Sequence, residues 1–222
     1  MAQPLDLQEQ EQLDAIKSFW KTYGNLITWA LVAALAVYAG LNAWRWYQRD
    51  QSAKAAAMFG ELDQAVQAGD AQRSGQIFND LKERYPRTVY AEQGGLLAAR
   101  VQFDRGQSDA AKASLTWVAE HAGEDEYKTV AHLRLAGLLL QAKDYDAALK
   151  QLDAAKAPTF QALVADRRGD VLLAQGKPAE AVASYQAAWK AMDDKVEYRR
   201  LIDAKLTALG ASPEAKAAEA GK

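Results

Sequence analysis

Residues 176–185 read GKPAEAVASY, and two similar segments precede them: GQSDAAKASL at residues 106–115 and KDYDAALKQL at residues 143–152. Each of the three follows a dip in the hydrophobic pattern. The alanine after the acidic residue recurs at nearly equal intervals, as Ala110, Ala147 and Ala181. Because Gly and Pro at such dips stop and start helices, the segments indicate a series of repeating helix pairs.

A period of roughly 35 residues with a helix–turn–helix unit is typical of tetratricopeptide repeats. In the fourth unit, Gly169 and Ala181 are small enough to let the two helices cross closely, and Tyr185 fills the space above them. An irregular helical bundle with the same contacts is the alternative. We expect an all-α fold, an α-solenoid whose last helix caps its exposed end. The predicted helices are residues 24–67, 72–84, 88–105, 108–121, 125–142, 145–156, 159–175, 178–191 and 194–208.

The composition limits the remaining possibilities. The chain has 222 residues, of which 50% are hydrophobic and 25% charged, so one modest domain and one apolar helix fit. Residues 51–222 hold 23 Lys or Arg and 24 Asp or Glu. Their net charge near −1 gives nucleic acid no electrostatic attraction, and we expect no nucleic-acid partner. The absence of cysteine excludes disulfides and thiolate metal sites.

Residues 23–44 carry no charge and read YGNLITWALVAALAVYAGLNAW. At a rise of about 1.5 Å per residue they make roughly 33 Å of helix, enough to cross a hydrocarbon core of about 30 Å. Aromatic and basic residues at positions 44–47 suit a headgroup interface. We expect a transmembrane helix at residues 23–47. A signal peptide, whose apolar core is shorter, and a buried core helix are the alternatives.

The flanking charges do not settle the orientation of this helix. Three positive groups precede it and three follow it, a tie under the positive-inside rule: Lys17, Lys21 and the α-amine, against Arg45, Arg49 and Lys54. Ala36 and Gly40 form a small-xxx-small pair on one face of the helix, and Asn42 is nearby. Such a face can pack against another membrane helix, and a lipid-facing, alanine-rich helix is the alternative.

The sequence contains no catalytic or metal-binding motif. Two histidines are too few for a His-based metal site, and no phosphate-binding glycine loop, nucleophile elbow or HExxH occurs. We expect no enzyme activity, no cofactor and no small-molecule substrate. Alignment of the units on the repeated alanine places ten side chains toward a groove lined by the first helices, a groove suited to an extended or helical protein segment. They are Phe59, Leu96, Arg100, Phe103, His132, Leu139, Leu163, Asp166, Asp170 and Leu173.

Three stretches are similar to a known family. They are EQLDAIKSFWKTYGN at residues 11–25, WRWYQ at residues 44–48 and YPRTVYAEQGGLLAAR at residues 85–100. They resemble the YfgM-like family, the ancillary subunits of the bacterial SecYEG translocon. Together with one span and divergent tetratricopeptide repeats, the resemblance covers nearly the whole chain.

The resemblance implies a single-pass protein of the bacterial inner membrane, in contact with membrane lipid. Residues 1–22 would be cytoplasmic and residues 48–209 a periplasmic repeat domain. Because residues 210–222 are small and charged, we expect them to form a flexible tail, and we also expect disorder over residues 1–10. The implied partners are the SecYEG translocon and a membrane-anchored periplasmic chaperone of the prolyl-isomerase type. The repeats would act as a scaffold between them and emerging secretory proteins. A tethered scaffold for envelope assembly and a regulator that sequesters a signalling protein are the alternatives.

Overall fold

The computed structural model describes residues 7–212, with side chains from residue 11 onward. All regular structure in that range is helical, which confirms the all-α prediction. The chain divides into two compact units, Met1–Gln51 and Ser52–Lys222, and residues of both belong to the first helix.

The helices agree with the predicted ones along most of the chain. In order they are α1 (Leu7–Gln67), α2 (Ala71–Arg84), α3 (Val89–Asp104), α4 (Ser108–His121), α5 (Asp125–Gln141), α6 (Tyr145–Ala154), the 3₁₀ turn η1 (Pro158–Phe160), α7 (Gln161–Ala174), α8 (Pro178–Ala191) and α9 (Tyr198–Ala208).

Two predicted helix starts are wrong. α1 is already helical at Leu7 rather than at residue 24, because the polar residues before the span include many helix formers and no proline or glycine. The disorder predicted for residues 1–10 is therefore wrong for residues 7–10. α9 begins at Tyr198 rather than at residue 194. There the Asp193 carboxylate accepts the backbone N–H of Lys195 at 2.9 Å, a local bond that competes with helix formation. Residues 1–6 and 213–222, with most of the predicted tail, lie outside the described residues.

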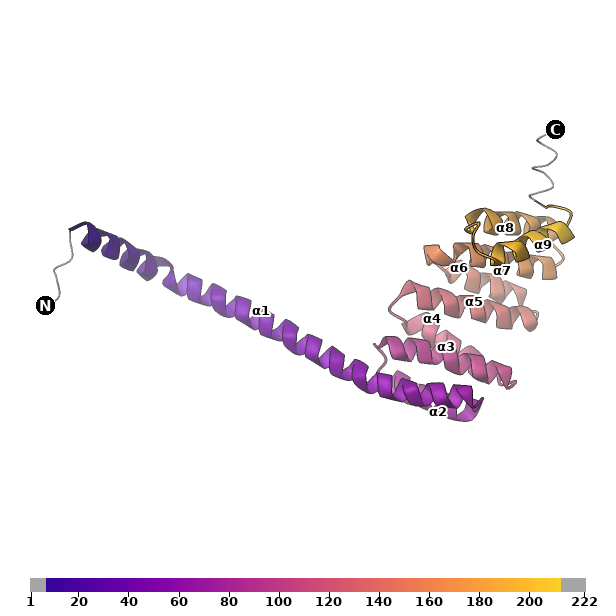
Figure 1. Cartoon of the computed structure of the whole chain (residues 1–222), viewed down its shortest axis with the longest axis horizontal. Coiled ribbons are helices and arrows are strands. Elements are labelled where there is room, and N and C mark those ends of the chain that lie inside the picture. The colour runs from indigo at the N-terminus through magenta and orange to yellow at the C-terminus, as the bar shows by residue number, and fades with distance from the viewer. Residues whose placement is uncertain (1–6, 213–222) are drawn as a thin grey trace, which may run out of the picture. The chain divides into compact units, whose positions relative to one another are not determined.

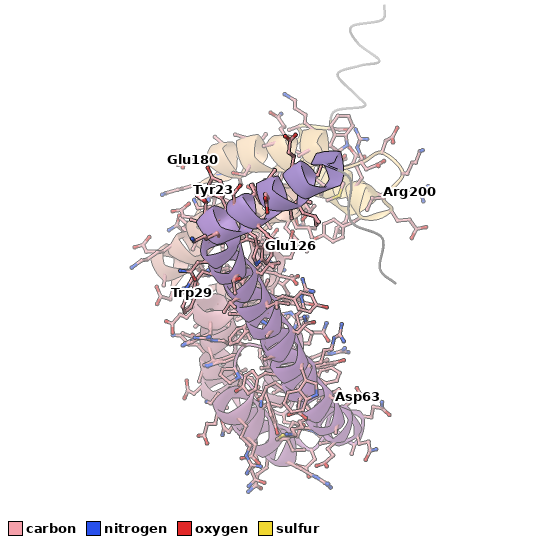
Figure 2. All side chains as sticks on the ribbon, turned by 90° about the vertical axis from the view of Figure 1, so that its left-hand side faces the viewer. Tyr23, Trp29, Asp63, Glu126, Glu180 and Arg200 are labelled. Carbon is pink, nitrogen blue, oxygen red and sulfur yellow. The ribbon has the colours of Figure 1, made fainter. Side chains whose placement is uncertain are left out.

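The first unit contains the candidate membrane span. α1 is the one helix among residues 7–212 that is long and apolar enough to cross a membrane. An 18-residue stretch within it has a mean hydropathy of 1.8 and is not buried. Its side chains stand outward around the helix (Figure 2), and Trp29 is 68% exposed. Apolar side chains exposed to this degree are suited to an apolar surrounding.

The second unit is a stack of helix pairs in chain order (Figure 1). Residues 52–67 of α1 pack with α2 through Leu62, Phe78 and Leu81. The further pairs are α3 with α4, α5 with α6 and α7 with α8. First helices of successive pairs also touch, α3 against α5 and α5 against α7. These contacts form a continuous row of first helices.

In every helix-pair repeat, which we call a repeat unit, the first helix ends at a residue with a left-handed backbone conformation. The five residues have φ between 62° and 77°, and they are Gly69, Gly106, Lys143, Gly176 and Gly210. Their nearly even spacing along the chain gives the repeat period directly. At each of them two backbone N–H groups reach back to free carbonyls of the helix end, for example Gly176 to Leu173 at 3.0 Å. Because Gly210 follows α9 as the other left-handed residues follow first helices, α9 takes the place of the first helix of a fifth unit, and it packs on α8 and caps the fourth.

The close crossing predicted for the fourth unit is confirmed. A Cβ atom added at Gly169 would lie 2.4 Å from Tyr185 Cε1, inside any allowed contact. Ala181 and Tyr185 are both completely buried, at 0% and 1% exposure. Only glycine on α7 therefore leaves room for the tyrosine ring of α8.

Candidate functional site

A cleft of about 590 Å³ opens on the row of first helices of the repeat domain, the compact part of the chain that begins at Ser52. Residues of α3, α5 and α7 form most of it. Its lining combines apolar side chains with three guanidinium groups: Phe103, Leu133, Leu138, Arg100, Arg134 and Arg167. A surface of this kind offers hydrophobic contact and charged hydrogen-bond donors together, which suits a protein segment better than a purely apolar or purely polar ligand.

Arg134 occupies the middle of this row, on α5. Its Nη1 donates to the backbone carbonyl of Leu96 on α3 at 2.8 Å, so the side chain is held across the space between the two helices. Burial lowers the pKa of Arg134 from its usual value, and the charge of Arg100 lowers that pKa further. The two guanidinium groups therefore repel each other across the cleft.

The other two arginines have weak acidic partners. Arg100 Nε lies 3.9 Å from Asp104 Oδ2, and both side chains are well exposed. Arg167 Nη1 lies 3.8 Å from Asp170 Oδ2, although that carboxylate also accepts a bond from Lys205 at 2.7 Å. Exposed or long ion pairs of this kind contribute little. Positive charge therefore remains available in the cleft.

Two of the ten predicted groove residues, Arg100 and Phe103, line this cleft. Three others belong to the apolar core or pack on it. Leu96 and Leu139 are buried at 8% and 5% exposure. Phe59 is half-buried, with its ring centroid 5.6 Å from that of Tyr90.

The other five predicted groove residues lie elsewhere. His132 Nδ1 is 2.7 Å from Gln151 Oε1, so this ring faces α6 within its own pair. Asp166 and Asp170 both bond Lys205 of α9, at 2.8 and 2.7 Å. Leu163 is half-buried and Leu173 is 41% exposed, and neither is among the residues that line the cleft.

Arg134, Gly137 and Arg167 line the cleft but were not predicted. A sequence signal for two of them exists, because the interval from Arg100 to Arg134 is nearly the same as that from Arg134 to Arg167. The interval from Arg134 to Arg167 equals that between the left-handed residues of their units, Lys143 and Gly176, whereas Arg100 lies one helical turn nearer to the left-handed residue of its own unit. Alignment on the alanine of the second helix did not reveal the three arginines, because it pairs Arg100 with Gly137 rather than with Arg134.

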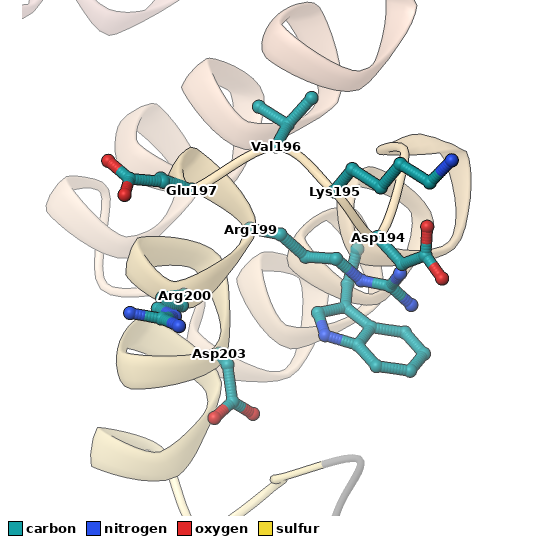
Figure 3. A pocket seen from close by; sticks show the side chains of 8 residues that line it. Asp194, Lys195, Val196, Glu197, Arg199, Arg200 and Asp203 are labelled. Carbon is teal, nitrogen blue, oxygen red and sulfur yellow. The ribbon is translucent and has the colours of Figure 1, made fainter.

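A second hollow, of about 470 Å³, lies beside the turn between α8 and α9 (Figure 3). Arg199 stacks there on Trp189, its Cζ 4.0 Å from the ring centroid. The hollow is lined by three acidic and three basic side chains: Asp194, Glu197, Asp203, Lys195, Arg199 and Arg200. Because these charges balance, the hollow has no preference for a charged partner, and the arginine-lined cleft is the stronger candidate site.

Within residues 7–212, no group of three or more His, Asp or Glu residues is placed to hold a metal ion.

A stack of helix pairs with a cleft along its first helices defines a helical-repeat protein of the tetratricopeptide class. Residues 17–211 match the tetratricopeptide repeat-like domain family. A protein of Neisseria gonorrhoeae named "Ancillary SecYEG translocon subunit" is 33% identical over 205 residues, which cover 91% of this chain and 98% of that protein. A protein of the same name from Escherichia coli is 28% identical over 82% of this chain and 87% of its own length. The chain belongs to the family of ancillary SecYEG translocon subunits.

Proposed function

We propose that this chain is a membrane-anchored adaptor of the Sec translocon, without enzyme activity. In this proposal the apolar stretch of α1 anchors the chain in the bacterial inner membrane, and the repeat domain binds protein segments in its arginine-lined cleft. The observation that carries the proposal is the 33% identity to a named translocon subunit over 91% of the chain.

The structure supports each half of this role separately. An exposed 18-residue stretch of helix with a mean hydropathy of 1.8 is suited to membrane lipid. A cleft of about 590 Å³ on stacked first helices is suited to a protein segment, because helical repeats present such extended surfaces for recognition.

The finer assignment concerns topology and partners. The proposed arrangement places the N-terminal segment in the cytoplasm and the repeats in the periplasm. There the repeats meet a membrane-anchored chaperone of the prolyl-isomerase type and the secretory proteins that emerge from SecYEG. Its basis is the similarity of residues 11–25, 44–48 and 85–100 to the family.

Protease accessibility tests the topology. Protease added to spheroplasts of Gram-negative cells that produce the chain should remove the repeat domain and leave a fragment of about 50 residues that the membrane protects. Protection of the repeat domain until the spheroplasts are lysed would reject the periplasmic location.

Co-purification tests the association. The full chain, extracted in mild detergent, should bring down SecY, SecE and SecG together with a periplasmic chaperone. The matched control is an unrelated single-span protein of similar size in the same membranes. Equal recovery of translocon subunits with both baits would reject the adaptor role.

A further inference from the structure

The three arginines of the cleft lie on the first helices of three successive units. They are Arg100 on α3, Arg134 on α5 and Arg167 on α7. Arg134 and Arg167 each stand nine residues before the left-handed residue of their unit, Lys143 and Gly176, whereas Arg100 stands six residues before Gly106, one helical turn closer. The solenoid therefore repeats one guanidinium per unit along its row of first helices. We call this set, Arg100, Arg134 and Arg167, the arginine ladder.

The spacing of the ladder follows from helix packing. α5 contacts both α3 and α7, and packed helices lie about 8–10 Å apart. The backbones that carry successive arginines are therefore separated by a similar distance, and the Arg134 side chain reaches from α5 across to the Leu96 carbonyl on α3. All three arginines line one cleft, and no acidic side chain is among the residues that line it.

The floor of the cleft is open next to the middle rung. Gly137 lies on α5, one helical turn after Arg134. A Cβ atom added there would meet only Arg167 Nη1, at 3.9 Å. A backbone that enters the cleft can approach α5 at this glycine, where a larger residue would fill the space.

The ladder carries positive charge that the protein itself leaves largely uncompensated. The partner of Arg134 Nη1 is a neutral carbonyl, that of Leu96. The carboxylates nearest to Arg100 and Arg167 lie 3.9 and 3.8 Å away. Carboxylates supplied by a partner can form shorter, bidentate bonds with these guanidinium groups.

We propose that the arginine ladder binds an extended acidic polypeptide segment with a carboxylate at every third residue. A chain in the polyproline II conformation rises about 3.1 Å per residue with three residues per turn, so every third side chain points the same way at intervals of about 9 Å. That interval matches the separation of packed helices. The apolar side chains of Phe103 and Leu138 then contact the residues between the acidic ones. This proposal rests on the adaptor role above and specifies the chemistry of its occupant.

A direct binding measurement tests the ladder. The probes are three fluorescein-labelled nonapeptides: (Glu-Pro-Ala)₃, the same composition with its three glutamates contiguous, and (Lys-Pro-Ala)₃. The full chain in detergent micelles should bind the spaced glutamate peptide, by fluorescence anisotropy, at least about tenfold more tightly than the lysine peptide. The chain should also bind the spaced glutamate peptide more tightly than the peptide with contiguous glutamates. Its affinity for the spaced peptide should fall with added salt. Equal affinity for all three peptides would overturn the proposal.

Two variants locate the binding. Gly137→Phe fills the cleft without a close contact at Cβ, and Gly60→Phe is its control, since an added Cβ at Gly60 has no neighbour within 4 Å. Arg100→Glu reverses the charge of an exposed rung, and Arg87→Glu makes the same change at an exposed turn residue outside the cleft. The affinity for the spaced glutamate peptide should fall about tenfold or more in the two cleft variants and should stay unchanged in the two controls. Thermal melts should show all four folded.

The same variants separate this proposal from the adaptor role when they are used as baits in the co-purification. Loss of the chaperone with both Gly137→Phe and Arg100→Glu supports the ladder. Loss with Gly137→Phe alone would overturn the acidic occupant and leave an adaptor that uses its cleft in another way. Retention of every partner by both variants would overturn the ladder as a binding site, while the translocon association is judged by the wild-type chain.

Discussion

Lys205 Nζ lies 2.8 Å from Asp166 Oδ1 and ties the capping helix α9 to α7. Asp166 is only 2% exposed, and its other oxygen accepts the hydroxyl of Tyr198 at 2.8 Å. The same ammonium group reaches Asp170 at 2.7 Å, and Asp170 accepts the hydroxyl of Tyr185 on α8 at 2.9 Å. Burial, followed by the bond to Asp166, raises the pKa of Tyr198 to about 12. One ionic network therefore closes the end of the solenoid across three helices.

Replacement of Lys205 by methionine should destabilise the repeat domain. The apolar stem is kept, but the buried Asp166 loses its positive partner. Removal of one member of a buried pair leaves an uncompensated charge, and because Lys205 is partly exposed we expect a loss of about 2–4 kcal/mol. Thermal or urea unfolding of the full chain in detergent, followed by far-UV circular dichroism, measures it.

Lys150→Met is the matched control, because Lys150 is exposed on α6. It should change stability by less than about 0.5 kcal/mol. Equal melting of both methionine variants would show that the ionic network contributes nothing to the cap.

A single methyl group at Gly169 should also destabilise the domain. The added carbon of Gly169→Ala would lie 2.4 Å from the Tyr185 ring, so α7 and α8 must move apart at a cost of roughly 1–3 kcal/mol. Gly60→Ala is the control, since an added Cβ there meets no atom within 4 Å. It should be neutral or slightly stabilising, because alanine favours helix over glycine. A Gly169→Ala chain that melts with the control would contradict the close crossing.

The turn after α5 offers a stabilising substitution. Lys143 has φ 62°, where the equivalent turns of the other four units have glycine. A left-handed conformation costs a side-chain-bearing residue about 1–2 kcal/mol, while glycine adds about 0.5–1 kcal/mol of unfolded-state entropy. Lys143→Gly should therefore raise the free energy of unfolding by up to about 1 kcal/mol. A lower melting temperature for this variant would show that the lysine side chain makes a compensating contact.

The repeat period and the helix pairs follow from local sequence, because Gly, Pro and small residues act within one turn or one helix crossing. The orientation of individual side chains depends on more. Asp166 and Asp170 lie on a first helix, as predicted, but their register turns them toward the next first helix, α9, and Lys205 compensates their charge there. A shift of one residue rotates a side chain by about 100° around the helix. An alignment based on an alanine of the second helix does not fix the position of side chains on the first helix to within one residue.

The sequence indicates the arginine ladder but does not indicate the cleft that the ladder lines. The members of the ladder recur at nearly equal intervals along the chain, so the sequence contained a signal. The cleft they line depends on the contacts of α5 with both α3 and α7 and on the open place at Gly137. Those are features of packing between units, and a single sequence does not specify them.

Glu92 should make stability depend on pH. Its Oε1 accepts the backbone N–H of Gly123 at 2.8 Å, Oε2 has no hydrogen-bond partner among the described residues, and the residue is 6% exposed. Burial raises the pKa of Glu92 from 4.5, against the lowering effect of the bond from Gly123. Between the unfolded and folded pKa values the folded chain binds more protons than the unfolded chain. The contribution of Glu92 therefore falls as the pH rises through that window and stays low above it.

Glu92→Gln removes this titration and keeps an oxygen for Gly123. The variant should gain stability relative to the parent as the pH rises above about 4.5, and melting temperatures of both chains from pH 4 to pH 8 measure the difference. Exposed Glu120→Gln on α4 is the control and should give a constant difference. A difference that is also constant for Glu92→Gln would show that its carboxylate is ionised equally in both states.

The last prediction separates the span from the cleft. Ala36, Gly40 and Asn42 were predicted to form a packing face, but Asn42 lies about 200° around the helix from Gly40, so only Ala36 and Gly40 share one side. Gly40 leaves open space where a side chain would stand, and Asn42 Nδ2 donates to the Tyr38 carbonyl at 3.0 Å, which leaves its amide oxygen available. Helix association in lipid depends on close backbone approach and polar contacts. Ala36→Ile should therefore reduce co-purification of translocon subunits, as should replacement of residues 23–44 by an unrelated apolar helix. Ala34→Ile, about 200° around the helix from Ala36, should not.

In the same experiment the Gly137→Phe chain should no longer co-purify with the periplasmic chaperone but should still co-purify with the translocon, because the cleft and the span make separate contacts. The two kinds of variant thus have opposite expected losses, and each serves as the folding control of the other. Identical partner lists for the parent, Ala36→Ile, the span replacement and Gly137→Phe would reject this division, since neither the small-residue face nor the cleft would then contribute to association. A span replacement that loses both partners would mean that the chaperone is bound through the translocon rather than through the cleft.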